Sequence, residues 1–183
     1  MPARSRDAPE TEESLVERYI RDVPDFPKKG ILFKDITPLL QSPEGLQECL
    51  DKMAAATDPK SYDLICGIES RGFIFGMGLA AKLKKGFVPI RKPGKLPWKT
   101  ASQAYELEYG TDRIEIHLDA VKPGQKVLLV DDLLATGGTM EAALKLVKQI
   151  GGVPVACSFV IELGFLKGRE KLNPTPVHAL LKF

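Results

Sequence analysis

Cysteine and histidine are scarce in this sequence of 183 residues. The three cysteines, Cys49, Cys66 and Cys157, are far apart and odd in number, which suits neither a disulfide framework nor a cysteine metal site. We expect them to be small buried apolar side chains in a reducing compartment. Since His117 and His178 are the only histidines, a histidine-based metal site is not expected either.

Long apolar runs and a strong excess of either charge are also lacking. No run approaches the roughly 20 apolar residues of a membrane helix, and the net charge is only +2. Neither a membrane partner nor a nucleic-acid partner is therefore indicated. Residues 1–14 are polar, include several acids and lack the apolar centre of a signal peptide. We expect a mobile tail over 1–14, a single domain over 15–183 and a cytoplasmic location.

Apolar strands alternate with helical patterns along the rest of the chain. Strands are predicted at 64–68, 87–90, 127–130, 153–161 and 177–181, with a hairpin formed by 105–109 and 113–118. Helices are predicted at 15–22, 43–56, 73–83, from Met140 onward and at 163–171, and residues 30–37 form an apolar loop or strand. Ser14 and Glu17 suit a capping box on the first helix. The alternation predicts an α/β fold with a central, mostly parallel sheet flanked by helices, in which ligands collect at the carboxyl ends of the strands.

The most informative segment runs from Val127 to Thr139. An apolar strand ends in Asp131 and Asp132, and a short turn containing two glycines leads into an amphipathic helix. The free N–H groups and the dipole of a helix N-terminus favour an anion such as phosphate. A carboxylate can accept hydrogen bonds from two neighbouring hydroxyls, which suits a vicinal diol. A phosphate beside a diol describes a ribose 5-phosphate.

Three other interpretations of these patterns are less favoured. The acidic strand end also suits the magnesium strand of a P-loop NTPase, but the sequence has no G-x-x-x-x-G-K-[ST] string. A purely structural turn would not need two acids followed by Ala-Thr-Gly-Gly-Thr. Residues 76–81 loosely match a dinucleotide-binding fingerprint, but they lie inside a helical pattern rather than at the end of a strand.

The segment Asp-Asp-Leu-Leu-Ala-Thr-Gly-Gly-Thr resembles the phosphoribosyl-diphosphate motif of type I phosphoribosyltransferases. Six further segments are similar to those of adenine-specific members of this family: Pro-Asp-Phe-Pro, Gly-Ile-Leu-Phe-Lys-Asp-Ile-Thr-Pro, Glu-Ser-Arg-Gly-Phe, Arg-Lys-Pro-Gly-Lys-Leu-Pro, Tyr-Glu-Leu-Glu-Tyr-Gly and Leu-Lys-Gly-Arg-Glu-Lys-Leu. The resemblance implies the type I phosphoribosyltransferase fold, with a flexible loop or hairpin lid and a small hood region. It also implies a homodimer in which the segment near Arg91 lies close to the partner.

The activity implied by this resemblance is transfer of the 5-phosphoribosyl group from phosphoribosyl diphosphate to adenine. The products would be AMP and pyrophosphate, and Mg²⁺ would be held by substrate and water rather than directly by protein residues. Two alternatives stay open. One is a phosphoribosyltransferase for guanine/hypoxanthine, xanthine, uracil or orotate. The other is a non-enzymatic regulator that senses phosphoribosyl diphosphate, although the chain shows no basic face and no room for a DNA-binding domain.

The resemblance also assigns roles to individual residues. The phosphoribosyl group would be bound by Asp131, Asp132, Ala135, Thr136, Gly137, Gly138 and Thr139. The pyrophosphate group carries several negative charges and would be bound by Ser70, Arg71, Arg91, Lys92 and Lys95. The adenine site would consist of Leu32, Phe33, Lys34 and Leu163. Glu106 and Glu108 lie on one face of a predicted strand, and the family pattern assigns the role of general acid/base to Glu108.

Overall fold

The computed structural model describes residues 14–106 and 110–183. Glu108 and residues 1–13 of the predicted tail therefore lie outside the described residues. The chain divides into two compact units, Met1–Glu48 and Cys49–Phe183, and each is described separately below. The single domain predicted over 15–183 stays a prediction. In the part of the chain that the structure describes, no helix is long and apolar enough to cross a membrane.

The first unit contains a small antiparallel hairpin and short helices. Strands β1 (Arg21–Pro24) and β2 (Leu32–Asp35) pair with each other, and helices α1 (Leu15–Arg18) and α2 (Thr37–Gln41) flank them in sequence. The helix predicted over 15–22 is wrong in length, because residues from Arg21 onward are used for strand pairing. The predicted capping box is also wrong: the Ser14 hydroxyl donates instead to Glu48 Oε1 at 2.9 Å. Helix α2 was not predicted, although Pro38 in its first turn suits a helix start.

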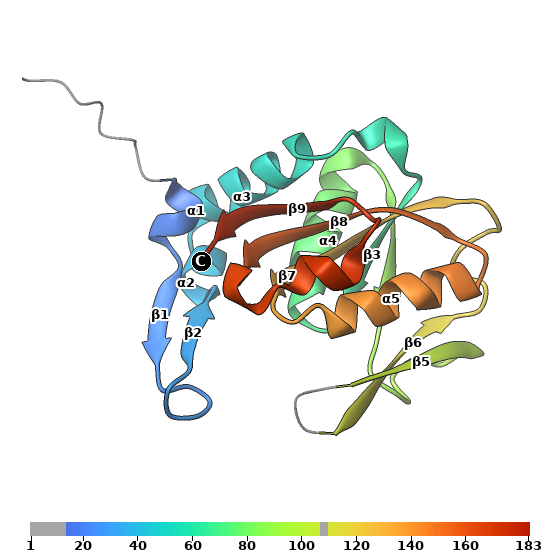
Figure 1. The fold of residues 1–183 in the computed structure, drawn as a ribbon. Helices are drawn as coiled ribbons and strands as arrows, with labels where there is room; N and C mark the ends of the chain where they lie inside the picture. The colour runs from blue at the N-terminus through green and yellow to red at the C-terminus, as the bar shows by residue number, and fades with distance from the viewer. Residues whose placement is uncertain (1–13, 107–109) are drawn as a thin grey trace, which may run out of the picture. The chain divides into compact units, whose positions relative to one another are not determined.

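The second unit is built on a five-stranded parallel sheet in the order β4-β3-β7-β8-β9 (Figure 1). The strands are β3 (Leu64–Ile68), β4 (Gly86–Ile90), β7 (Lys126–Leu134), β8 (Val153–Glu162) and β9 (Val177–Lys182). The predicted α/β fold with a parallel central sheet is confirmed. In the central strand, residues 127–130 are fully buried, as expected for an apolar strand covered on both faces.

Two helices connect the sheet strands in opposite directions. Helix α4 (Arg71–Leu83) carries the chain from β3 to β4, and α5 (Gly138–Gln149) carries it from β7 to β8 (Figure 1). Because such crossovers are right-handed, the two helices cover opposite faces of the sheet. From β3 the chain continues to β4 on one side of the sheet, and from β7 it continues to β8 on the other side. The direction of the connections therefore reverses at the boundary between β3 and β7. That boundary is the topological switch point at which sheets of this type bind ligands.

The remaining elements complete the second unit. Helix α3 (Pro43–Ala55) contains the boundary between the two units, after Glu48. The turn η1 (Pro59–Ser61) precedes β3. Strands β5 (Thr100–Glu106) and β6 (Thr111–His117) form the predicted hairpin, but its first strand begins five residues before the predicted start at 105. The helix predicted over 163–171 consists instead of two 3₁₀ segments, η2 (Gly164–Leu166) and η3 (Gly168–Leu172), joined at Lys167 in a left-handed conformation.

The three cysteines behave as the sequence predicts. The side chains of Cys49, Cys66 and Cys157 are all buried. Loss of hydration on burial raises the pKa of the Cys66 and Cys157 thiols to about 12, so these two side chains are neutral and unreactive at physiological pH.

Candidate functional site

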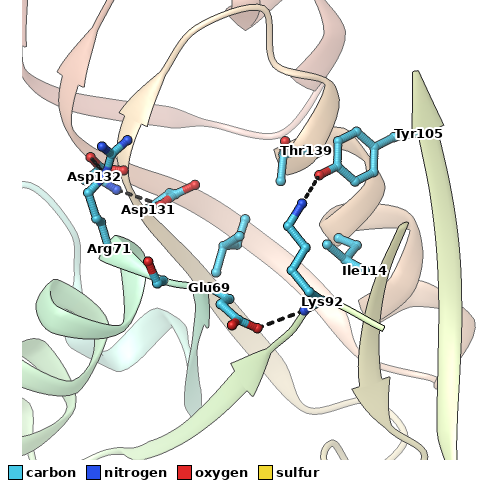
Figure 2. A pocket seen from close by; sticks show the side chains of 10 residues that line it. Glu69, Arg71, Lys92, Tyr105, Ile114, Asp131, Asp132 and Thr139 are labelled. Carbon is cyan, nitrogen blue, oxygen red and sulfur yellow. Dashed lines mark hydrogen bonds and ion pairs between the residues drawn. The ribbon is translucent and has the colours of Figure 1, made fainter. Parts of the chain in front are cut away.

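A cavity of about 290 Å³ opens at the switch point between β3 and β7 (Figure 2). Its walls come from the ends of both strands, the loop after β4, the β5–β6 hairpin and the start of α5. The lining residues are Ile68, Glu69, Ser70, Arg71, Lys92, Tyr105, Ile114, Asp131, Asp132 and Thr139. Six of these ten residues were predicted as site residues from the sequence: Ser70, Arg71, Lys92, Asp131, Asp132 and Thr139. The fold therefore brings together groups that lie up to 69 positions apart in the sequence, from Ser70 to Thr139.

A smaller cavity of about 90 Å³ adjoins the first and shares Asp131 and Thr139 with it. The rest of its wall is formed by the segment 133–140 and Phe159. This segment contains the predicted phosphate-binding residues Ala135, Thr136, Gly137 and Gly138. Since α5 begins at Gly138, the free N–H groups of its first turn border this cavity.

Glycine is required in this loop for two separate reasons. Gly137 has a φ of 83°, which lies in the left-handed region that L side chains avoid. A Cβ atom at Gly137 would also lie only 2.5 Å from the carbonyl oxygen of Gly168. The backbone of η3 thus supports the loop from behind. The sequence pattern gave no indication of this support, because the two glycines are 31 positions apart.

Asp131 and Asp132 lie inside β7, which continues to Leu134 rather than ending before them as predicted, because the strand goes on pairing with β8. The two acids sit in a poorly hydrated position. The Asp132 side chain is only 6% exposed, and its backbone N–H donates to Asp131 Oδ1 at 2.9 Å. Burial raises the pKa of both carboxyls, and for Asp131 the neighbouring Asp132 charge raises it further. Arg71 opposes the shift, with its Nε 2.6 Å from Asp132 Oδ2. Ionisation of the two carboxyls is thus unfavourable in the free protein, and hydrogen-bond donors or a positive charge would favour it.

Close packing holds these acids against the start of α4. At Gly72 a Cβ atom would lie 2.8 Å from the Val130 carbonyl oxygen and 2.9 Å from Asp131 Oδ1. A side chain at this position would push the helix away from the strand. Glycine here lets the helix N-terminus and Arg71 approach the carboxylates.

Glu69 organises the cations that follow β4. Its carboxylate accepts two hydrogen bonds from Arg91, Nε to Oε2 at 3.1 Å and Nη2 to Oε1 at 3.2 Å. The backbone N–H of Lys92 also donates to it at 2.9 Å. Burial acts against ionisation, but the bonds from Arg91 and Lys92 lower the pKa of Glu69, which therefore stays charged at neutral pH.

Two predicted pyrophosphate residues consequently do not line either of these cavities. Arg91 is turned toward Glu69, and its Nη1 donates to the carbonyl oxygen of Lys95 at 3.1 Å. Lys95 therefore lies next to the Arg91–Glu69 ion pair, and its charge helps to lower the pKa of Glu69. The pyrophosphate roles assigned to Arg91 and Lys95 stay predictions.

The sequence reasoning missed four residues of the larger cavity, namely Ile68, Glu69, Tyr105 and Ile114. Glu69 could have been found, because it directly follows a predicted strand and precedes Ser70 and Arg71. Tyr105 could not, since its position depends on how the hairpin packs against the rest of the second unit.

Three of the predicted adenine residues lie on β2 of the first unit. Leu32 is 50% exposed, and the Phe33 ring packs edge-on against Phe26 with centroids 5.2 Å apart. The Lys34 ammonium pairs with Asp22 at 2.6 Å, and its side chain is only 10% exposed. Because Phe26 is 51% exposed, this aromatic pair is only partly covered within the first unit.

Leu163, the fourth predicted adenine residue, lies in the second unit at the end of β8. Its backbone N–H donates to the Leu134 carbonyl oxygen at 2.9 Å, and its side chain is partly exposed. This places Leu163 next to the end of β7, where the chain leads into residues 135–138.

Comparison with known proteins shows the family of this chain. Residues 36–173 match the family described as the phosphoribosyl transferase domain. The adenine phosphoribosyltransferase of Thermotoga petrophila is 52% identical over 168 residues, which cover 92% of this chain and 99% of the relative.

Solved structures give the same result. The adenine phosphoribosyltransferase of Thermoanaerobacter pseudethanolicus superposes with a TM-score of 0.89 at 53% identity, covering 92% of this chain and 98% of the other. The enzyme of Saccharomyces cerevisiae, solved with an imino-altritol bisphosphate and adenine, gives a TM-score of 0.83 at 42% identity, with 90% and 96% coverage. The resemblance inferred from the sequence is confirmed.

Proposed function

We propose a role for each site residue of this chain, which belongs to the adenine phosphoribosyltransferase family. The reaction of this family transfers a phosphoribosyl group to adenine and gives AMP and pyrophosphate. The observation that carries the proposal is the pair of adjoining cavities that share Asp131 and Thr139. A helix N-terminus borders one cavity, cations line the other, and two acids lie where the cavities meet. This order matches the phosphate, ribose and pyrophosphate of phosphoribosyl diphosphate.

The smaller cavity takes the 5-phosphate. The N–H groups at the start of α5 and the hydroxyls of Thr136 and Thr139 donate to the phosphate oxygens, and the helix dipole favours their charge. Ala135, Gly137 and Gly138 leave room for the phosphate to approach the backbone. A crystal soaked with AMP tests this assignment. The phosphate should lie beside residues 136–139, and a phosphate bound elsewhere would contradict it.

Asp131 and Asp132 hold the ribose hydroxyls. Each hydroxyl donates to a carboxylate, and these bonds favour the charged acids that burial alone disfavours. The same charges stabilise the positive charge that develops on the ribose ring as the bond to pyrophosphate breaks. The acids thereby act more strongly on the transition state than on the bound substrate.

The larger cavity takes the pyrophosphate. Ser70, Arg71 and Lys92 line it, and Arg91 and Lys95 lie in the same loop as Lys92. In the free protein Arg71 is paired with Asp132. Substrate therefore gives both partners new contacts: a phosphate oxygen for the guanidinium and ribose hydroxyls for the acid.

The base site and the proton acceptor come from other segments. By resemblance to the family, Phe33 stacks on adenine, and the backbone of Leu32 and Lys34 recognises its polar edge. The family pattern also assigns a contact with the base to Leu163. The ring nitrogen of adenine forms a bond to C1 of the ribose while the bond from C1 to the pyrophosphate oxygen breaks. Glu108 accepts the proton that this nitrogen loses.

Replacement of Glu108 by alanine tests the role of this residue. Without the carboxylate, the nitrogen proton has no fixed acceptor, so kcat should fall by about 10²–10⁴-fold with little change in the KM for phosphoribosyl diphosphate. Steady-state kinetics with each nucleobase measures both quantities. Turnover near the unmodified level would remove Glu108 from the mechanism, and equal use of hypoxanthine would contradict the choice of adenine.

Magnesium fits this site as an ion bound to the substrate. In the described ranges 14–106 and 110–183, no group of three or more His, Cys, Asp or Glu side chains could hold a metal. An ion that keeps much of its water and binds phosphate oxygens would be held by the diphosphate and water, while Asp131 and Asp132 beside it hold the ribose hydroxyls. When bound, Mg²⁺ would neutralise the charge of the diphosphate. Removal of Mg²⁺ by EDTA should abolish turnover, and added Mg²⁺ should restore it.

We also place the protein in the cytoplasm as a homodimer. Ile74 and Met77 lie one turn apart on α4 and are 41% and 53% exposed, and Trp98, in the loop that contains Arg91, is 63% exposed. Burial of these side chains against a second copy would remove apolar surface from water. Light scattering after gel filtration tests this, with a mass near twice the 20.1 kDa of the chain as the expected result.

A further inference from the structure

Lys92 is already engaged by other residues in the free protein. Its ammonium donates to the Tyr105 hydroxyl at 3.1 Å and forms an ion pair with Asp112 (Figure 2 shows the bond to Tyr105). The Tyr105 hydroxyl in turn donates to Asp112 at 3.1 Å. Tyr105 and Asp112 are direct partners across the β5–β6 hairpin, so the hairpin register fixes both groups.

This cluster lies at the edge of the larger cavity but is not wholly part of it. Lys92 and Tyr105 line the cavity, whereas Asp112 is not among its lining residues. Asp112 therefore holds the ammonium from the hairpin side. Among the described residues, two acids form ion pairs with cations of the cavity: Asp132 with Arg71, and Asp112 with Lys92. Asp132 lines the cavity itself, so Asp112 is the one that can be altered without changing the cavity wall.

Both members of the pair are charged at neutral pH. The bond from Lys92 lowers the pKa of Asp112. Partial burial acts to lower the pKa of Lys92, but the bonds to Asp112 and Tyr105 outweigh it and raise that pKa. A diphosphate in the cavity must therefore compete with a full negative charge for this ammonium.

We propose that Asp112 is a positioning residue that competes with pyrophosphate for the Lys92 ammonium and so weakens the binding of this product. The proposal rests on the proposed role of Lys92 in the pyrophosphate site. An ammonium has three donors, and Tyr105 can keep one of them whichever anion takes the next. Asp112 thus offers Lys92 an alternative partner as pyrophosphate leaves, which favours product release.

The test measures inhibition by inorganic pyrophosphate in four proteins: the unmodified chain, Asp112→Asn, Lys92→Met and the double variant. Asp112→Asn keeps the size of the side chain but removes the competing charge. The pair is partly exposed, with the two side chains 42% and 28% accessible, so its strength is that of a screened ion pair. The inhibition constant for pyrophosphate should fall by about two- to five-fold, and Lys92→Met should raise it.

The double variant decides whether Asp112 acts through Lys92. In the Lys92→Met background, Asp112→Asn should leave the inhibition constant unchanged, because there is no ammonium to release. Asp112→Glu keeps the charge and should stay near the unmodified value. Asp119→Asn removes one exposed charge beyond the end of β6 and serves as the control for net charge, with no change expected.

The outcomes separate the two proposals. If Lys92→Met does not alter pyrophosphate inhibition, the role of Lys92 fails and this inference falls with it. If Lys92→Met weakens inhibition but Asp112→Asn leaves it equal or weaker, the competition is refuted while the site assignment stands. If Asp112→Asn changes the inhibition constant equally with Lys92 and in the Lys92→Met background, the competition for the Lys92 ammonium is also refuted. Asp112→Ala gives a second measurement of the same effect, and thermal melts of all variants identify any that are misfolded.

Discussion

Replacement of Gly137 by alanine tests how the phosphate loop is held. The substitution adds one methyl group at a residue with a φ of 83°, directly in front of the Gly168 carbonyl oxygen. Two costs should arise. The side chain is strained at positive φ, and the new carbon atom would lie 2.5 Å from a backbone atom that cannot rotate away.

The chain provides a matched control for the first cost. Gly124 has nearly the same φ, 82°, but a Cβ atom there would meet nothing within 4 Å. Gly124→Ala should therefore cost only the left-handed strain of about 1–2 kcal/mol. Gly137→Ala should cost this amount plus about 1–3 kcal/mol for overpacking.

Thermal unfolding measures the difference between these two variants. For a chain of this size, 1 kcal/mol corresponds to roughly 2–4 °C. The melting temperature of Gly137→Ala should therefore lie roughly 2–12 °C below that of Gly124→Ala. Because the loop must move away from Gly168 to relieve the contact, Gly137→Ala should also raise the KM for phosphoribosyl diphosphate. Loss of about 1 kcal/mol of binding would raise it about five-fold.

Either of two results would refute this reasoning. Equal melting temperatures for the two variants would show that the contact with Gly168 carries no cost. A normal KM in a destabilised Gly137→Ala protein would show that the loop does not need its present position to bind substrate.

Two further predictions follow from the acids. Asp131→Asn should abolish most activity but raise the melting temperature at pH 7, since a carboxyl whose pKa is raised by burial destabilises the charged folded state. This gain should shrink as the pH is lowered toward about 4, and a lower melting temperature at pH 7 would contradict the prediction. Asp35 has the opposite shift, because hydrogen bonds from Thr37 and then Arg21 lower its pKa to about 2. The stability that it contributes should be present above about pH 4 and be lost as the pH falls toward about 2, so urea unfolding of Asp35→Asn and the unmodified chain should differ at pH 7 and converge at low pH.

The parts that could be predicted from the sequence are those that depend on neighbouring residues. The apolar run at 127–130, the acids that follow it and the glycine turn are contiguous, so the strand, the site and the helix start could all be inferred from one segment. The sheet class followed from the alternation of strands and helices. Even the approximate location of the site followed, because parallel strands end at one edge of a sheet.

The predictions failed where a distant segment decided the local structure. The first helix ends at Arg18 because Arg21 pairs with Asp35 across the β1–β2 hairpin. The helix predicted over 163–171 becomes two 3₁₀ segments, and Gly168 of the second segment packs against the phosphate loop. No periodicity within either segment contains this information.

Sequence alone determined the candidate site in the second half of β7, because adjacent residues place two acids, a glycine turn and a helix start one after another. Only the tertiary structure decided which cations face the cavity. Arg91 and Lys92 are neighbours in the chain, yet Glu69 turns the first away and Asp112 holds the second at the cavity edge. The partners of these two cations lie about 20 residues away in the sequence, so only strand register and loop packing bring the opposite charges into contact.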